Sequence, residues 1–218
     1  MTEKQREDVM LKLLGRQTSG NVQKVLFALE ETGVAYDRQD YGRQFNNTQT
    51  PEYKALNANG KVPTLIDGET VIWESNTILR YIAAIRAPSL TGATPAEKTD
   101  VERWMDWLLA SINAPYLTMF KDSKKPAGER VSDFDAQGKE LALLLALADT
   151  HLATREWFAL GRLTLADIAL GPILKRCLAF PIDLPELPKL KSWAARVEAR
   201  PAFQAATGAK PAPVASAA

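Results

Sequence analysis

The chain has 218 residues, of which 46% are hydrophobic and 24% charged, a composition that excludes disordered and fibrous proteins. Its 27 Lys and Arg against 26 Asp and Glu give a net charge of +1, so nothing indicates a nucleic acid or an anionic membrane as partner. The single cysteine, Cys177, excludes internal disulfides and cysteine-rich metal sites, and it fits a reducing compartment.

The N-terminal residues do not predict a secretory signal. Residues 1–8 are polar, and no apolar segment with a small-residue cleavage site follows them, so we expect no secretory signal. The most apolar run, residues 141–148, is shorter than the roughly 20 residues of a membrane helix. Residues 208–218 are poor in bulky apolar side chains and are expected to form a flexible tail. We therefore expect a soluble, cytoplasmic protein.

The first elements predict a strand, a helix and a second strand. Residues 9–14 are rich in apolar side chains and end at Gly15, which indicates a short strand in the centre of a sheet. A helix follows, with Gly33 as its C-terminal cap, and residues 34–36 begin the next strand. Since crossovers between strands are right-handed, these two strands should be parallel.

A hairpin and a helix are predicted next. Residues 62–66 and 70–73 are β-branched and apolar, and the Asp67-Gly68 turn between them favours antiparallel pairing. After residue 73 the apolar spacing becomes helical, so a helix should begin near Glu74 and Ser75. Before the hairpin, residues 41–50 form a polar segment and Pro51 begins a short helix.

Helical periodicity dominates after residues 88–93, which contain Pro and Gly and which we interpret as a linker. The expected domains are therefore residues 1–87, with the sheet, and residues 94–207, all helical. The second domain should contain helices at about 94–121, 126–152, 164–179 and 186–199. Thr164 and Asp167 predict a capping box at the start of the third of these.

Val62-Pro63 and Glu74-Ser75 carry a family resemblance. Proline at a strand entrance cannot donate to the ladder, which favours an edge, a bulge or a cis turn and leaves the Val62 backbone available. The two pairs and their spacing resemble the glutathione-binding segment of the cytosolic glutathione S-transferases. The order βαβ followed by ββα resembles their thioredoxin-like domain, and the resemblance covers nearly all of residues 9–207.

The resemblance implies glutathione as co-substrate, no metal, and a homodimer. It implies that the Val62 backbone pairs with the cysteinyl part of glutathione, in the manner of an added strand next to Pro63. Glu74 and Ser75, at a helix start, suit the γ-glutamyl carboxylate. Lys61 matches a position from which relatives reach the glycyl carboxylate.

The loop between the first strand and the first helix contains the candidates for thiol activation. In the serine-type classes, such as theta, delta and zeta, the catalytic serine lies six residues before a helix valine, which implies Ser19 here. Thr18 is adjacent, and Asn21 lies where some bacterial disulfide-reducing relatives have a thiol-contacting asparagine. Thr18 or Ser19 would alternatively only cap the helix.

Aromatic side chains of the helical domain are candidates for the pocket of a hydrophobic co-substrate, with Trp107, Tyr116 and Phe120 as the expected lining. Trp104 and Trp107 on one helix also predict apolar surface that a second copy would cover. Cys177 should belong to the core, and we assign His151 no catalytic role.

The sequence thus predicts a glutathione transferase in which the glutathione thiolate attacks a small hydrophobic electrophile. Two alternatives stay open. A glutathione-dependent disulfide reductase would use the same tripeptide site, and Asn21 favours it. A non-catalytic protein of the same fold would bind hydrophobic ligands without turnover.

Overall fold

The computed structural model describes residues 10–208, which divide into two compact units. One unit comprises the residues up to Pro88 and those from Ala199 onward, and the other is Ser89–Glu198. The first boundary lies at Pro88, and the chain returns to the first unit from Ala199 onward, whereas the sequence predicted one uninterrupted helical domain at 94–207. The polar residues 1–8 and, apart from Gly208, the predicted tail 208–218 lie outside the described residues.

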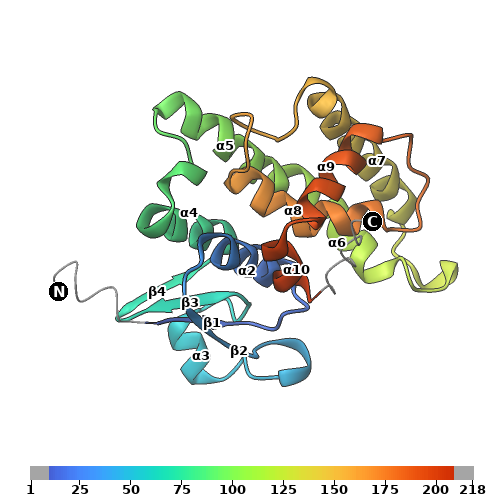
Figure 1. Cartoon of the computed structure of the whole chain (residues 1–218). Helices are drawn as coiled ribbons and strands as arrows, with labels where there is room; N and C mark the ends of the chain where they lie inside the picture. The colour runs from blue at the N-terminus through green and yellow to red at the C-terminus, as the bar shows by residue number, and fades with distance from the viewer. Residues whose placement is uncertain (1–9, 209–218) are drawn as a thin grey trace, which may run out of the picture. The chain divides into compact units, whose positions relative to one another are not determined.

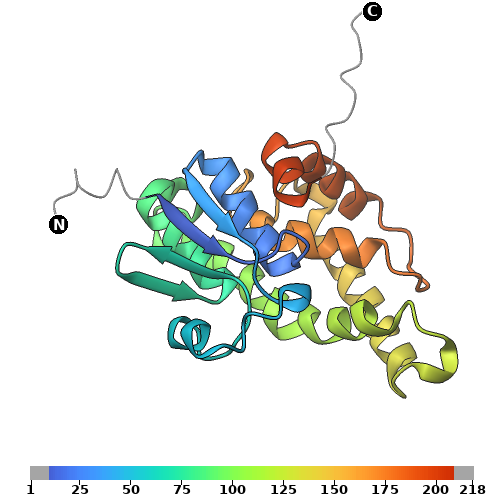
Figure 2. The same cartoon turned by 90° about the horizontal axis from the view of Figure 1, so that it is seen from below.

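The first unit is built on a four-stranded mixed sheet of order β2-β1-β3-β4 (Figure 2). The strands are β1 (Leu11–Leu14), β2 (Tyr36–Gln39), β3 (Thr64–Asp67) and β4 (Thr70–Trp73). As predicted, β1 pairs parallel with β2, and β3 pairs antiparallel with β4. The central position predicted for the first strand is confirmed, since β1 also pairs antiparallel with β3.

Helices cover both faces of this sheet (Figure 1). On one face lie α2 (Gly20–Thr32), α4 (Ser75–Arg86) and α10 (Pro201–Thr207), and on the other lies the short α3 (Pro51–Leu56). Two 3₁₀ turns complete the unit, η1 (Arg43–Phe45) and η2, which crosses its boundary at Pro88–Leu90.

The sequence did not predict α10 as a separate helix, and its place beside α2 depends on contacts between distant residues. The ring of Phe203 meets that of Phe27 edge-on, with centroids 5.3 Å apart. Arg200 forms an ion pair with Glu31. Helical periodicity alone cannot assign such a helix to a unit, because both partners are more than 165 residues away in the chain.

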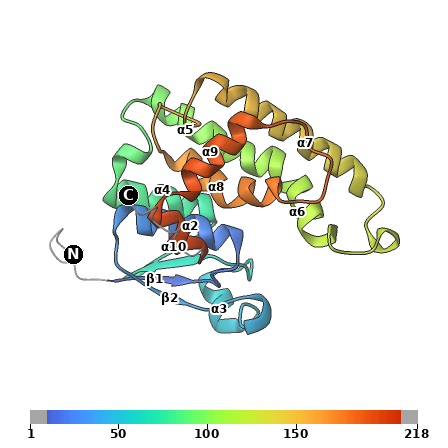
Figure 3. The ribbon, with the colours of Figure 1, turned by 45° about the vertical axis from the view of Figure 1, so that its right-hand side comes forward.

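The second unit is helical, as predicted (Figure 3). Its elements are α5 (Pro95–Trp107), the π-helical turn η3 (Leu108–Ile112), α6 (Asn113–Asp122), η4 (Ala127–Glu129), α7 (Phe134–His151), η5 (Leu152–Thr154), α8 (Leu165–Leu178) and α9 (Pro188–Glu198). Within residues 10–208, no helix combines the length and apolar character needed to cross a bilayer.

Two predicted helices differ from the observed ones. The helix expected at 94–121 contains the π-helical turn, next to Pro115, whose missing N–H prevents a regular ladder at that point. The helix expected to start at 126 begins only at Phe134. Asp122 holds the intervening segment as a loop, because its carboxylate accepts from the Val131 N–H at 3.0 Å and pairs with Lys125 at 2.7 Å.

The capping box at the start of α8 is confirmed. The Asp167 carboxylate accepts from the N–H and the hydroxyl of Thr164, at 3.0 and 3.1 Å. It also accepts from the Phe158 N–H at 3.0 Å and from the Trp193 indole at 2.9 Å. Burial raises the pKa of Asp167 to about 6, in opposition to these four bonds. The box therefore connects three separate segments of the helical unit.

We predict that Thr164→Ala lowers the free energy of unfolding by about 1–2 kcal/mol, because the first turn of α8 loses its cap in a fully buried position. Urea denaturation followed by circular dichroism measures this. Thr99→Ala is the control, since Thr99 is an exposed helical threonine whose hydroxyl donates to the Pro95 carbonyl. Equal midpoints for the two variants would contradict the prediction.

Candidate functional site

The strand register gathers three chain segments at one end of the sheet of the first unit. Thr64 of β3 lies opposite Leu14 of β1 on one side and opposite Trp73 of β4 on the other. The loop that follows Leu14, the segment that precedes Thr64 and the residues after Trp73 therefore leave the sheet side by side. These segments contain all the residues predicted to bind glutathione or to activate its thiol.

Val62 precedes β3 through a cis peptide bond to Pro63, as the sequence indicated. Side chains from α3 and the turn after it hold this segment. The Tyr53 hydroxyl donates to the Lys61 carbonyl at 2.7 Å, and the Asn57 amide donates to the same oxygen at 2.9 Å. The backbone N–H and C=O of Val62, in contrast, make no hydrogen bond to any residue in the described range. A free strand position is thus present beside β3.

Two glycines let Val62 approach the neighbouring loops. A Cβ on Gly15 would lie 3.5 Å from the Cβ of Val62 and only 2.5 Å from a methyl group of Val22. Gly42 has φ +84°, and a Cβ there would lie 3.4 Å from a methyl group of Val62. The free strand position therefore lies close to the loop that leads from β1 to α2.

Ser19 ends this loop as the N-cap residue of α2. Its side chain is buried, yet its hydroxyl makes no hydrogen bond within the part of the chain that the structure describes. The structure therefore does not show the Ser19 hydroxyl capping α2. Thr18 is exposed, and Asn21 is exposed in the first turn of α2.

Glu74 and Ser75 begin α4 in a similar way. Glu74 is the N-cap residue with φ +70°, a conformation that costs a residue with a side chain about 1–3 kcal/mol. Ser75 is 4% exposed, and its hydroxyl makes no hydrogen bond to the described residues. By comparison, Thr50 caps α3 and accepts from the Tyr53 N–H at 3.3 Å. The start of α4 thus offers unsatisfied N–H groups and a hydroxyl to an anion.

The predicted residues of the thiol and glutathione sites all lie on, or within one helical turn of, the three segments that leave this end of the sheet: Thr18, Ser19, Asn21, Lys61, Val62, Pro63, Glu74 and Ser75. Sequence reasoning missed Tyr53 and Asn57, which are buried and hold the Lys61 carbonyl. Their common partner is a backbone carbonyl 4 and 8 residues further along the chain, and a contact to a backbone group leaves no residue pattern in the sequence. Burial raises the pKa of Tyr53, so its hydroxyl stays a donor at neutral pH.

The aromatic residues expected to line a hydrophobic pocket lie in the second unit and separate into two groups. Tyr116 stacks on Phe120 with ring centroids 5.7 Å apart, and Arg176 donates to the Tyr116 hydroxyl at 3.2 Å. Trp107 instead meets Trp104 edge-on at 5.3 Å. Trp104 is only 8% exposed, so the prediction that both tryptophans offer uncovered surface is wrong for this residue.

The contacts of His151 and the burial of Cys177 in the helical unit fit structural roles for both residues. A ring nitrogen of His151 lies 2.9 Å from the Phe158 carbonyl, and burial lowers the pKa of this histidine. Cys177 is fully buried, and burial raises the pKa of its thiol, which opposes the reactive thiolate form. Between residues 10 and 208, no cluster of three or more acidic, His or Cys side chains could hold a metal ion.

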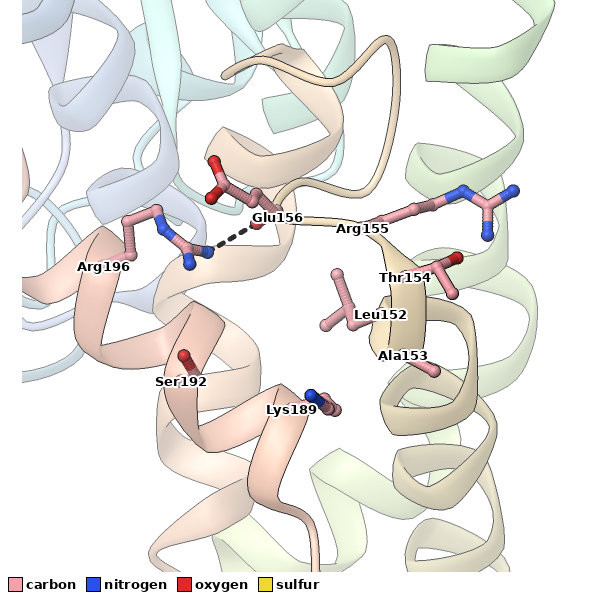
Figure 4. A pocket seen from close by; sticks show the side chains of 8 residues that line it. All are labelled: Leu152, Ala153, Thr154, Arg155, Glu156, Lys189, Ser192 and Arg196. Atoms are coloured by element: carbon pink, nitrogen blue, oxygen red, sulfur yellow. Dashed lines mark hydrogen bonds between the residues drawn. The ribbon is translucent and has the colours of Figure 1, made fainter.

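The helical unit also contains a polar pocket of about 230 Å³ between η5 and α9 (Figure 4). Its lining is Leu152, Ala153, Thr154, Arg155, Glu156, Lys189, Ser192 and Arg196. The guanidinium of Arg196 donates to the Glu156 carbonyl at 2.7 Å and closes one end. The pocket contains none of the predicted site residues, and it is smaller than most sites for drug-sized ligands.

Two family models match the chain. The family model for the glutathione S-transferase N-terminal domain matches residues 9–84, and the model for the C-terminal domain matches residues 101–201. Together these matches cover most of the chain.

Two named relatives and one solved structure belong to the same family. Glutathione S-transferase GstB of Escherichia coli is 35% identical over 200 residues, which cover 89% of this chain and 96% of that protein. Glutathione S-transferase 3 of Zea mays is 32% identical, with 93% and 96% covered. The theta class glutathione S-transferase of Xanthomonas axonopodis pv. citri, crystallised with glutathione bound, is 41% identical with a TM-score of 0.86, and 91% of this chain and 97% of that chain are covered. This chain belongs to the glutathione S-transferase family.

Proposed function

We propose that the protein transfers glutathione to a small hydrophobic electrophile, and that glutathione binds at the end of the sheet from which the segments with Ser19, Val62 and Ser75 emerge. The observation that carries the proposal is the set of unsatisfied groups there: two helix starts and one strand position without partners among the described residues. From β1 across β3 to β4 these groups span about 10 Å, since strands lie about 4.8 Å apart. An extended tripeptide has about the same length.

The middle of the tripeptide fits Val62. Its free N–H and C=O support pairing with the cysteinyl residue of glutathione as an added strand. The γ-glutamyl carboxylate then faces the start of α4 and the Ser75 hydroxyl, which favour an anion. Lys61 is exposed beside Val62 and complements the glycyl carboxylate at the other end.

The thiol reaches the start of α2. A hydrogen bond from the Ser19 hydroxyl and the positive end of the helix both stabilise a thiolate relative to a thiol. A fall of two units in the pKa of the glutathione thiol requires about 2.7 kcal/mol, which one charge-assisted hydrogen bond and a helix terminus supply. The thiolate then attacks the electrophile and its leaving group departs.

The helical unit is proposed to provide the apolar contacts for the electrophile, with Tyr116 and Phe120 as the main candidates, because they stack on each other and form part of an aromatic group with Phe180. Trp107 belongs to the separate group around Trp104 and is the weaker candidate. Reduced glutathione is a cytoplasmic thiol, so we propose the cytoplasm as the place of action.

Replacement of Ser19 by Ala is expected to raise the pKa of the bound glutathione thiol and to slow conjugation about 10–100-fold, with a smaller effect on glutathione affinity. The thiolate absorbance of bound glutathione as a function of pH measures the first effect, and steady-state conjugation of a chloronitrobenzene measures the second. Thr18→Ala tests the adjacent, exposed candidate by the same two measurements.

The same measurements on Asn21→Ala distinguish the alternatives. If this variant instead shows the raised thiol pKa, and reduction of a glutathione mixed disulfide suffers most, then the protein is a disulfide reductase that uses Asn21. Wild-type binding of glutathione without either turnover would identify a non-catalytic binding protein. Wild-type thiol pKa in all three variants would contradict the proposed mechanism.

We further propose a homodimer. The sheet of the first unit ends at the edge strand β4, on which Val71 and Trp73 point to the same face and are 36% and 42% exposed. An edge strand with exposed apolar side chains is unusual in a monomer, because it would promote aggregation. Cover by a second copy explains these exposed side chains.

Sedimentation equilibrium at micromolar concentration is expected to give the mass of a dimer, and Val71→Lys is expected to shift the equilibrium toward monomer at least tenfold. Leu143→Lys is the control, because Leu143 is 68% exposed on α7 of the other unit. A monomeric wild type, or a larger shift with the Leu143 variant, would show that β4 does not form the interface.

A further inference from the structure

The polar pocket between η5 and α9 lies within the helical unit, and the proposed function does not use it (Figure 4). Three of its lining side chains come from α9, namely those of Lys189, Ser192 and Arg196. These residues are three and four positions apart, so they share one face of the helix. One wall of the pocket therefore presents an ammonium, a hydroxyl and a guanidinium group.

Hydrogen bonds join α9 to the chain around η5 at two points. At the start of α9, the Asp149 carboxylate accepts from the backbone N–H groups of Lys189 and Leu190, both at 2.8 Å. Two turns further along, the Arg196 guanidinium donates to the Glu156 carbonyl at 2.7 Å. Because backbone groups take part in all three bonds, the fold itself defines the pocket.

Several polar groups of the lining lack a partner among the described residues. The Lys189 ammonium and the hydroxyls of Thr154 and Ser192 form no hydrogen bond or ion pair with any residue from 10 to 208. Arg155 and Arg196 donate to backbone carbonyls, and neither pairs with a carboxylate in that range. The pocket thus offers donors and positive charges that a ligand can use.

The lining also carries an excess of positive charge. It contains three cations, Arg155, Lys189 and Arg196, against one carboxylate, Glu156, which leaves a charge of +2. In Figure 4 the side chains of Arg155 and Glu156 both point away from Lys189, and without this pair of opposite charges the sum is again +2. The neighbouring Asp149 carboxylate already accepts two N–H groups. The pocket is therefore a local concentration of positive charge.

Charge, donors and size together favour a phosphate group as the ligand. A phosphate monoester carries a charge of about −1.5 to −2 near pH 7, which balances the +2 of the lining. A monocarboxylate would leave one positive charge unbalanced. Lysine is a common phosphate ligand, and the arginine fork matches phosphate oxygens. A pocket of about 230 Å³ whose apolar lining is only Leu152 and Ala153 suits a small, polar molecule.

We propose that this pocket binds a phosphate group, free or in a small monoester, through Lys189, Ser192 and Arg196. None of these residues belongs to the proposed glutathione site, so the proposal does not depend on how glutathione binds or reacts. It adds a second ligand to the protein, one that the helical unit recognises with its own residues.

NMR titration of the isotope-labelled full chain with glycerol phosphate at constant ionic strength tests the proposal. The amide signals of Thr154 and Ser192 should shift and saturate. Inorganic phosphate and acetate are the comparison ligands. Tighter binding of glycerol phosphate than of inorganic phosphate identifies a monoester site, and equal binding identifies a site for free phosphate. Both results support the proposal, whereas acetate binding as tight as that of glycerol phosphate would overturn it.

Lys189→Met should weaken the binding of glycerol phosphate about tenfold or more, because it removes a charge-assisted donor. Lys191→Met is the matched control, since Lys191 is exposed on the same helix but does not line the pocket. It should bind as the wild type does. Both variants should keep the wild-type Tm, because the Lys189 side chain has no partner among the described residues and its backbone N–H keeps its bond to Asp149.

Three further outcomes would overturn the proposal. Equal weakening by Lys189→Met and Lys191→Met would show that phosphate responds only to the net charge of the chain. Shifts that rise with glycerol phosphate without saturating would show that no site exists. Saturating shifts of the same amides with S-methylglutathione would show that the pocket is a second glutathione site. Failure of the proposed transferase activity would change none of these measurements, so the two proposals are tested separately.

Discussion

Thr64 is the residue on which the geometry of the site depends. It pairs with Leu14 on one side and Trp73 on the other, so it fixes which residues of three segments leave the sheet together. Its buried hydroxyl lies 3.0 Å from that of Tyr53, and it accepts from the Asn57 amide at 3.1 Å. Since Tyr53 donates its single proton to the Lys61 carbonyl, Thr64 donates to Tyr53. One threonine thus connects strand register and loop position.

The first unit carries several energetically costly features, while the helical unit, which has a left-handed Leu160 of its own, also contains a buried carboxylate that is well satisfied. In the first unit these are a left-handed Glu74, two helix starts without side-chain caps, and Lys24, which is buried and forms no ion pair with the described residues. In the helical unit, the fully buried Asp167 carboxylate accepts four hydrogen bonds. A protein maintains local strain and unsatisfied groups where a ligand satisfies them. The unsatisfied groups at the end of the sheet therefore agree with a sheet unit that binds a ligand there.

The sequence predicted what local rules determine. The Asp67-Gly68 turn and the alternation around it fixed the hairpin, and Val62-Pro63 indicated a free strand position because proline cannot join a ladder. The capping box was predictable because its two members, Thr164 and Asp167, lie three residues apart. Ser19 and Ser75 were predicted as site residues, but the sequence did not indicate that their hydroxyls lack hydrogen-bond partners among the described residues.

Features that depend on distant contacts were not predictable. The helix α10 joins the first unit through Phe203, whose ring contacts that of Phe27. Lys24 has an ordinary helical context in the sequence, and only the packing of α2 shows that it is buried. Trp104 was misjudged as surface because a helical stripe has the same spacing whether a neighbour covers it or not.

Amide hydrogen exchange, measured residue by residue by NMR with and without glutathione, tests the central claim most directly. If glutathione satisfies the free groups at the end of the sheet, exchange of the backbone N–H of Val62 and of Ser75 slows at least tenfold, while the amides of α7 keep their rates. Unchanged exchange at Val62 and Ser75 under saturating glutathione would contradict the account, because the ligand would then be bound elsewhere.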